Sequence, residues 1–123
     1  MTQEERTLLH IDLSERVPYD TVLWVNGLVT SNEEFGDAYL DTVSWYGEVS
    51  VRDGSRVSYD IADVRPYLRP MSSMTEEEED EYELVCRKSI TTQIDWLNKN
   101  MFDYRGLIQK GLALEAPNGM YNS

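Results

Sequence analysis

The stretch RPYLRPMSSMTEEEEDEYE, residues 65–83, separates a part of the chain rich in strand-forming residues from a part with helical spacing. Pro66 and Pro70 lack a backbone donor, and each holds the residue before it in an extended conformation. The stretch ends in an acidic run, residues 76–83, in which only Tyr82 is not Asp or Glu. We therefore expect an extended connector over residues 65–70 that does not continue the interior of a sheet, followed by the start of a helix.

The helix after the connector has a clear start and a long apolar stripe. Thr75 and Glu78 match a capping box, in which the threonine hydroxyl accepts from the Glu78 amide and the glutamate side chain reaches back. Lys99 lies at the other end, where the helix dipole favours a cation. Apolar residues between these ends recur in steps of three and four and predict one helix over about residues 75–98: Tyr82, Val85, Cys86, Ile90, Ile94 and Leu97.

The part before the connector is expected to be mainly β. Residues 20–27, DTVLWVNG, have the composition of a strand followed by a turn. Residues 41–61, DTVSWYGEVSVRDGSRVSYDI, predict a hairpin that turns at Asp53-Gly54, and Gly47 marks a bulge or bend in its first arm. Residues 4–14 have mixed spacing that suits a helix or a strand, and we favour a short helix.

The end of the chain predicts a short helix from Asp103, as N-cap, to Gly111. The tail, residues 118–123, is expected to be loose unless Met120 and Tyr121 dock.

Strands that come first and helices that follow indicate an α+β fold. We expect one domain over residues 1–123, with a short helix and a β-rich part in 1–65, a proline-rich connector in 66–74 and a helical part in 75–117. Its β part, about residues 20–65, would be a small twisted antiparallel sheet or a partly open barrel. The long C-terminal helix and the short final helix would pack on it.

The net charge of −12 is unusual for a chain of 123 residues, and the acidic run supplies more than half of it. This charge argues against direct binding to nucleic acid, which needs clustered Lys and Arg, and is compatible with a basic protein partner. No apolar window is long enough to span a membrane, and the N-terminus lacks the basic start of a signal peptide. The single Cys86 fits a reducing cytoplasm.

The sequence predicts no catalytic residue, no cofactor and no metal site. His10 is the only histidine and stands in no recognisable motif, and Cys86 falls on the apolar stripe, which predicts a buried structural thiol. One His and one Cys cannot form a structural zinc site, the acidic run does not match a calcium loop, and the glycines are too far apart for a phosphate loop.

Trp45 and Tyr46 are adjacent in the predicted hairpin and should therefore point to opposite faces of a strand. We expect one to pack under the helices and the other to be partly exposed. The alternative is that one of them lines a binding surface, since aromatic residues are enriched at interface hot spots.

Two strings, PYLRPMSSMTEEE (66–78) and DYRGLIQKGLALEAPNGMY (103–121), resemble signatures of small uncharacterised proteins from phages and prophages of gut anaerobic bacteria. The resemblance covers most of the chain in order, and RVPY (16–19) corresponds to a further short element of that group. It implies expression in the cytoplasm of a host bacterium and carries no activity to transfer. We expect the motif residues to have a structural role, positioning and capping the long helix. The alternative is that Tyr67, Arg69, Tyr104 and Arg105 form a shared polar and aromatic surface.

Our leading hypothesis is a non-enzymatic phage or prophage accessory protein that binds a host or phage protein. Glu76, Glu77 and Glu78 are accounted for by the first helical turn, where free amides and the dipole favour negative charge. The acids beyond that need would belong to an interaction surface: Glu79, Asp80, Glu81 and Glu83.

Two alternatives remain open, and a homodimer through an exposed sheet edge is compatible with each. One is an acidic mimic of nucleic acid that inhibits a defence enzyme. The other is a protein that sequesters a nucleotide signal in a pocket beside Trp45 or Tyr46, with phosphates bound by arginines; the candidates are Arg52, Arg56, Arg65 and Arg69.

Overall fold

A computed structural model describes residues 1–26, 38–52, 58–117 and 119–121. Its elements run in the order α1 (Gln3–Arg16), β1 (Leu23–Val25), β2 (Leu40–Val43), β3 (Glu48–Val51), β4 (Ser58–Asp60), η1 (Ile61–Asp63), β5 (Val64–Pro70), η2 (Met71–Ser73), α2 (Glu76–Cys86), α3 (Ile90–Lys99), β6 (Phe102–Asp103) and β7 (Leu114–Glu115). The α+β class is therefore confirmed, and the described strands form two open sheets rather than a closed barrel.

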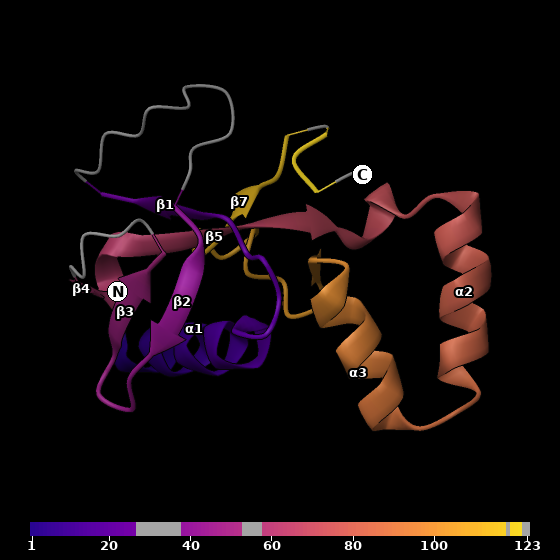
Figure 1. Cartoon of the computed structure of the whole chain (residues 1–123), viewed down its shortest axis with the longest axis horizontal. Helices are drawn as coiled ribbons and strands as arrows, with labels where there is room; N and C mark the ends of the chain where they lie inside the picture. The colour runs from indigo at the N-terminus through magenta and orange to yellow at the C-terminus, as the bar shows by residue number, and fades with distance from the viewer. Residues whose placement is uncertain (27–37, 53–57, 118, 122–123) are drawn as a thin grey trace.

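The N-terminal helix α1 is confirmed and runs slightly beyond the expected residues 4–14. Thr2 accepts from the Glu5 amide and the Glu5 side chain accepts from the Thr2 amide, which is a capping box. Leu9 and Leu13, one turn apart, are fully buried in the core. Figure 1 shows α1 lying across the foot of the strands, which places one end of the helix beside the turn that joins β2 to β3.

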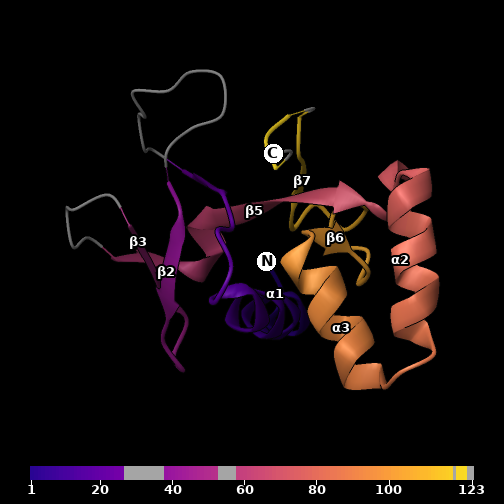
Figure 2. The same ribbon diagram turned by 45° about the vertical axis from the view of Figure 1, so that its right-hand side comes forward.

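The expectation that residues 65–70 lie outside the interior of a sheet is wrong, because β5 is the central strand of a four-stranded sheet. β1 pairs with β5 antiparallel, whereas β6 and β7 pair with it in parallel. This sheet is therefore mixed rather than purely antiparallel. Figures 1 and 2 both show β5 running across the molecule from the strands to the top of α2.

The spacing of the two prolines explains how β5 can be central. The Tyr67 amide donates to the carbonyl of Val22, just before β1, at 2.9 Å, and the Arg69 amide donates to the carbonyl of Met101, just before β6, at 2.7 Å. Successive amides of a strand point to opposite edges, so Pro66 and Pro70 both face the other edge. There the two-residue β7 pairs only with Tyr67 and Leu68. Neither missing donor is needed at that edge.

The predicted hairpin over residues 41–61 is a three-stranded meander, β2–β3–β4. Its first arm folds back at Ser44–Gly47, where the Gly47 amide donates to the Ser44 carbonyl at 3.1 Å and Gly47 has a φ of 91°. The bend expected at Gly47 is therefore a full turn between two strands. The turn expected at Asp53-Gly54 lies outside the described residues.

The single helix expected over residues 75–98 is wrong, because the chain breaks it into α2 and α3, which stand side by side in Figures 1 and 2. Ser89 caps α3 by accepting from the Thr92 amide at 3.1 Å, a second start signal that the apolar spacing concealed. The capping box of Thr75 and Glu78 is confirmed at the start of α2. Cys86 is exposed rather than buried, because it ends α2 instead of continuing a stripe.

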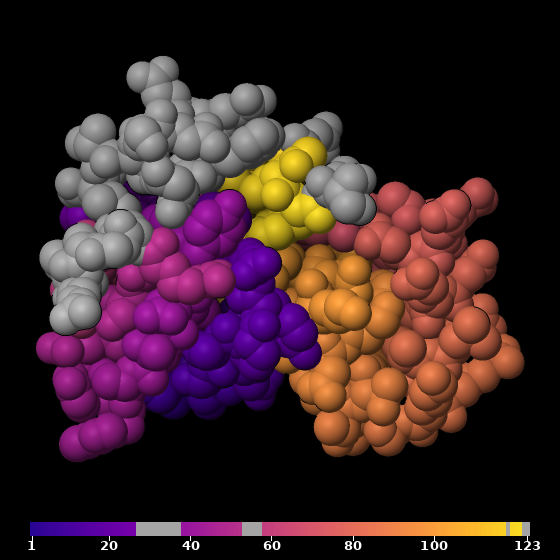
Figure 3. Space-filling model, in the orientation of Figure 1, coloured from indigo at the N-terminus to yellow at the C-terminus, as the bar shows by residue number. Residues whose placement is uncertain are grey.

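None of the eleven residues of α2 is buried, so this helix is held by a few specific contacts. Tyr82 stacks on Trp96 of α3 at 5.4 Å between ring centroids, and Trp96 stacks on the buried Phe102 at 5.7 Å. Arg69 also lies over the Phe102 ring, 4.3 Å from its centroid, and binds Glu78 of α2. Figure 3 shows the two helices as a block beside α1 and the strands.

The short final helix expected from Asp103 to Gly111 is also wrong. Asp103 lies in β6, and its carboxylate accepts from the amides of Leu107 and Ile108 at 2.8 and 2.9 Å, which stabilises turns instead of a helix. The tail docks through Tyr121, whose hydroxyl donates to the Tyr67 carbonyl at 2.7 Å and accepts from the amide of residue 22 at 2.9 Å. Burial raises the pKa of Tyr121 well above its ordinary value.

Candidate functional site

The turn between β2 and β3 carries the most exposed large hydrophobic side chain in the described part of the chain. Trp45 is 87% exposed and Tyr46 is 56% exposed. Both occupy the central positions of the Ser44–Gly47 turn, so strand alternation does not apply and the expectation that one packs under the helices is wrong. Their rings meet edge to face, 5.3 Å apart and at 87°.

Backbone and side-chain hydrogen bonds hold this aromatic turn in one conformation. The Ser44 side chain accepts from the Glu48 amide at 2.8 Å, and the Ser44 amide donates to the Glu48 carbonyl at the same distance. His10 of α1 lies 2.8 Å from the Ser44 carbonyl through Nε2, which must carry the hydrogen because a carbonyl only accepts. The turn is therefore fixed both to β3 and to α1.

Gly47 completes the turn in a conformation that other residues adopt at a cost. Its φ of 91° lies in the left-handed region, and a Cβ added there would lie 3.0 Å from Arg6 Nη2. Its carbonyl accepts from the Ile61 amide at 2.9 Å, which ties the turn to η1. The sequence signal of Gly47 was correct, although it marks a turn and not a bulge.

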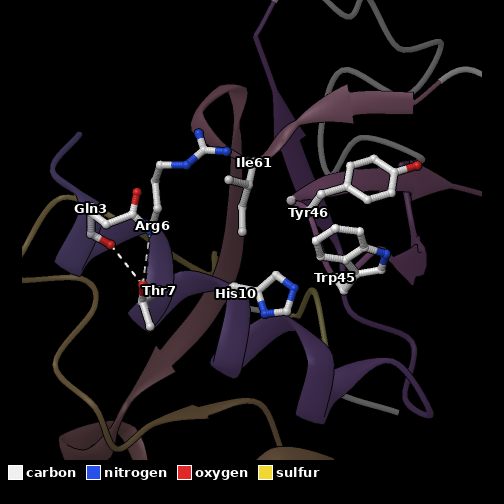
Figure 4. A pocket seen from close by; sticks show the side chains of 8 residues that line it. Gln3, Arg6, Thr7, His10, Trp45, Tyr46 and Ile61 are labelled. Atoms are coloured by element: carbon white, nitrogen blue, oxygen red, sulfur yellow. Dashed lines mark hydrogen bonds between the residues drawn. The ribbon is translucent and has the colours of Figure 1, made fainter.

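A hollow of about 400 Å³ opens between the turn and α1. Figure 4 shows the side chains of α1 on one side, Trp45 and Tyr46 on the other, and Ile61 between them. We call these residues the aromatic-turn site: Gln3, Arg6, Thr7, His10, Trp45, Tyr46, Gly47 and Ile61.

The charge of Arg6 in this site is already matched. Arg6 binds both carboxylate oxygens of Asp60, at 2.9 and 3.3 Å. The hydrogen bond from Arg6 lowers the pKa of Asp60, and the same bond raises the pKa of Arg6. The site therefore offers exposed aromatic rings and hydrogen-bonding groups rather than a net positive charge.

Tyr104 and Arg105, two residues proposed for a shared surface, belong to a polar cluster centred on α1. Arg105 donates to Asp12 at 2.7 Å and to Glu15 at 2.6 Å, and its guanidinium lies 4.6 Å from the Tyr104 centroid. Burial alone would raise the pKa of Glu15, but hydrogen bonds from Arg105 and Tyr104 outweigh it and lower that pKa.

The inner part of this cluster is a buried ion pair that sequence reasoning missed. Asp12 and Arg16 are both 0% exposed, and Arg16 donates to Asp12 through Nε at 2.9 Å and Nη2 at 3.1 Å. Arg16 Nη2 also donates to the Phe102 carbonyl at 2.7 Å. The available signal was the i, i+4 spacing of Asp12 and Arg16 on the same face as Leu9 and Leu13.

Tyr67 and Arg69 do not join this cluster, since no hydrogen bond or ion pair between described residues links them to Tyr104 or Arg105. Arg69 donates to both carboxylate oxygens of Glu78 at 2.7 Å. This pairing lowers the pKa of Glu78 to about 2, because the guanidinium hydrogen bonds stabilise the charged carboxylate. The two sequence strings therefore meet through the pairing of β5 with β6 and β7, while their polar side chains belong to two separate groups.

Two of the four acids that α2 does not need at its start have a hydrogen-bond partner. Glu81 accepts from Trp96 Nε1 at 3.3 Å, and Glu83 accepts from Arg87 at 2.7 Å in a pair with both side chains well exposed. Glu79 and Asp80 are exposed and make no ion pair with a described residue. The surplus is thus spread around α2 rather than gathered in one cluster.

The arginines expected to bind phosphates are engaged elsewhere where the structure describes them. Arg52 binds Asp20 at 2.8 Å and lies over the Tyr39 ring, and Arg65 lies over the Trp24 ring. Arg56 lies outside the described residues.

In residues 1–26, 38–52, 58–117 and 119–121, no three His, Cys, Asp or Glu side chains come together in a way that could hold a metal ion. The described helices include none with the length and apolar character needed to cross a membrane. Comparison of the chain with protein-family models, curated proteins and solved structures found no match.

Proposed function

We propose that this protein acts by binding another protein, with Trp45 as the anchor of the contact. The observation that carries the proposal is a tryptophan residue, Trp45, that is 87% exposed at the tip of a turn fixed by hydrogen bonds to β3, α1 and η1. Tryptophan and tyrosine are enriched among the residues that dominate binding energy at interfaces. A fixed turn also loses little conformational freedom on binding, which favours affinity.

The free energy of burying the Trp45 side chain is large enough for an anchor. Burying a large aromatic side chain removes about 150–250 Å² from water, which is worth about 4–6 kcal/mol before the costs of association. A truncated hot spot commonly costs about 2–4 kcal/mol, so Trp45→Ala should weaken binding about 30-fold to 1,000-fold. As part of the same proposal, the partner is a host or phage protein in a bacterial cytoplasm and the chain has no enzymatic activity.

The nucleotide alternative receives less support. The aromatic-turn site does hold a hollow beside Trp45 and Tyr46, but its one arginine, Arg6, is matched by Asp60. A thermal-shift screen against nucleotides tests it, because a ligand at 100 times its dissociation constant adds about 2.7 kcal/mol of stability.

Photo-crosslinking in a bacterial lysate tests the main proposal. A photoreactive amino acid replaces Tyr46, which leaves the anchor in place, and the matched control carries it at Asp95, an exposed position of α3. We expect a discrete protein adduct from position 46 that is absent from position 95 and is lost when Trp45→Ala is added. The same adduct with and without Trp45→Ala, or no adduct from position 46, would count against the proposal.

A further inference from the structure

A second surface lies on different elements, where α3 faces the turns of residues 104–109. It is a groove of about 980 Å³ whose described lining is more apolar than polar by a small margin, since Ser72, Gln93 and Gln109 stand among its aliphatic residues. After Trp45, Ile90 in this groove is the most exposed large hydrophobic side chain in the described part of the chain, at 66%. We call it the Ile90 groove, and these residues define it: Met71, Tyr82, Ile90, Ile94, Leu97 and Ile108.

The groove continues a core stripe out to the surface. Ile90, Ile94 and Leu97 are spaced i, i+4 and i+7 on α3, so they lie on one face of the helix. Leu97 is buried in the described structure, Ile94 is half-buried and Ile90 is exposed. The stripe therefore leaves an aliphatic face in contact with water at the start of α3, near its connection to α2. Burial of this face by a partner would be favourable.

The charges around the groove select the kind of partner. Among the described residues that line it, Asp103 and Glu115 are acidic and none is Lys, Arg or His. Tyr82 of α2 also lines the groove. Glu79 lies three residues before Tyr82, so the two side chains are neighbours on the helix surface, and Glu83 follows Tyr82 directly.

Asp103 and Glu115 therefore line the groove, and Glu79 and Glu83 border its α2 residue, Tyr82, on the helix. Of these, Asp103 is committed to backbone amides and Glu83 only to an exposed ion pair. Exposed pairs of this kind contribute little and exchange readily for another cation. An approaching segment with Lys or Arg beside its apolar face would meet a complementary field, which raises the association rate and selects against acidic segments.

We propose that the Ile90 groove binds an amphipathic helical segment of another protein, with an apolar face against Ile90 and Ile94 and with Lys or Arg on its flanks. Apolar anchors at i, i+3, i+4 and i+7 of a helix match an elongated apolar groove, which is a recurring mode of peptide recognition. This site is separate from the aromatic-turn site, and neither proposal depends on the other.

Fluorescence anisotropy with synthetic peptides tests the proposal on the full chain. Three labelled peptides of about 18 residues are compared: one with leucines at helical spacing and lysines elsewhere, one with the same leucines and glutamates elsewhere, and the lysine peptide in scrambled order. We expect saturable one-to-one binding of the first peptide, with the other two at least about tenfold weaker.

Variants of the chain then locate the site. Ile90→Asn and Ile94→Asn should each weaken the lysine peptide about tenfold or more, and Glu79→Gln with Glu83→Gln should weaken it several-fold and reduce its salt dependence. Trp45→Ala is the matched control and should leave the affinity unchanged. Because Ile90 is largely exposed, Ile90→Asn should keep the thermal midpoint of the wild-type chain.

Four results would overturn the proposal. The scrambled peptide binds as well as the ordered one, which means attraction by charge alone. Ile90→Asn leaves the affinity unchanged in a folded chain. Trp45→Ala weakens the peptide as much as Ile90→Asn, which places it at the aromatic-turn site. The chain alone forms a dimer that Ile90→Asn abolishes, which makes a second copy the occupant.

Discussion

Replacing Asp12 by Asn should be among the most destabilising single changes in this protein. Asp12 is fully buried and accepts two hydrogen bonds from Arg16 and one, at 2.7 Å, from Arg105. Asparagine fills the same space but removes the charge, so Arg16 stays buried with the Phe102 carbonyl as its main remaining acceptor. Arg16 Nη1 has no hydrogen-bond partner among the described residues even in the wild-type chain.

Breaking a buried ion pair from one side costs about 3–5 kcal/mol, because the other charge is left without compensation. A domain of this size has a free energy of unfolding of about 5–15 kcal/mol, so Asp12→Asn should remove a large part of it. Urea unfolding followed by tryptophan fluorescence measures the loss, since Trp96 lies in the stack between Tyr82 and Phe102.

Two variants serve as controls for this prediction. Arg87→Ala removes an exposed pair with Glu83 and should cost less than about 0.5 kcal/mol. Asp12→Leu with Arg16→Met removes both buried charges and should cost less than Asp12→Asn alone. A cost below about 1 kcal/mol for Asp12→Asn would mean that groups other than this carboxylate compensate the buried charge of Arg16.

Three further predictions concern the contacts that hold the helices, the turn and the tail. Glu78 pairs with Arg69 and has a pKa lowered from 4.5 to about 2, so its stabilisation is present above pH 4.5 and is lost as the pH falls towards 2. Glu78→Gln should remove about 1–2 kcal/mol of stability at pH 7, a value kept small because solvent partly screens the pair. Between pH 4.5 and 2 the urea midpoint of this variant should fall less than that of the wild-type chain; an equal fall would contradict the pairing of Glu78 with Arg69. Gly47→Ala should cost about 1–2 kcal/mol in chemical unfolding, since the residue needs a positive φ and the new methyl group would press on Arg6, and a neutral effect would mean that the turn has another conformation. Tyr121→Phe should cost about 1–3 kcal/mol and speed hydrogen exchange at the edge of β1, because two backbone groups lose the hydroxyl that joins them; exchange at the wild-type rate would show that the tail does not dock there.

The start of α2 was predictable from the sequence, because the two residues of its capping box, Thr75 and Glu78, act on each other's backbone within one turn. The helix α1 was only the favoured interpretation of a mixed spacing, since Leu9 and Leu13 suit a helix or a strand. The strand residues around Trp24 and Val49 were also readable, because their composition favours strands at short range.

The errors came from choices that depend on contacts distant in sequence. A central role for β5 rests on β1, β6 and β7, which approach from both sides, and the sequence of residues 65–70 shows only its prolines. The apolar spacing continues across residues 87–89 and so suggests one helix, although Ser89 starts a second one. The stacking of Trp96 between Tyr82 and Phe102 favours two helices folded side by side.

Two residues of the candidate site, Trp45 and Tyr46, were predicted, but the α1 side chains that line it and its geometry were not. Trp45 and Tyr46 were chosen as adjacent aromatic residues, whereas their joint exposure depends on a turn that Ser44 and Gly47 close and that His10 anchors from α1. The Asp12–Arg16 pair could not be separated from an ordinary surface pair, because its burial is produced by β6, more than eighty residues further along the chain.

Crosslinking from position 46 decides whether the exposed Trp45 side chain anchors a protein partner. We expect one discrete protein adduct in lysate that disappears with Trp45→Ala, while the thermal midpoint of that variant stays at the wild-type value because Trp45 is 87% exposed. An adduct of the same mass and yield with Trp45→Ala in a folded chain would show that Trp45 is not the anchor.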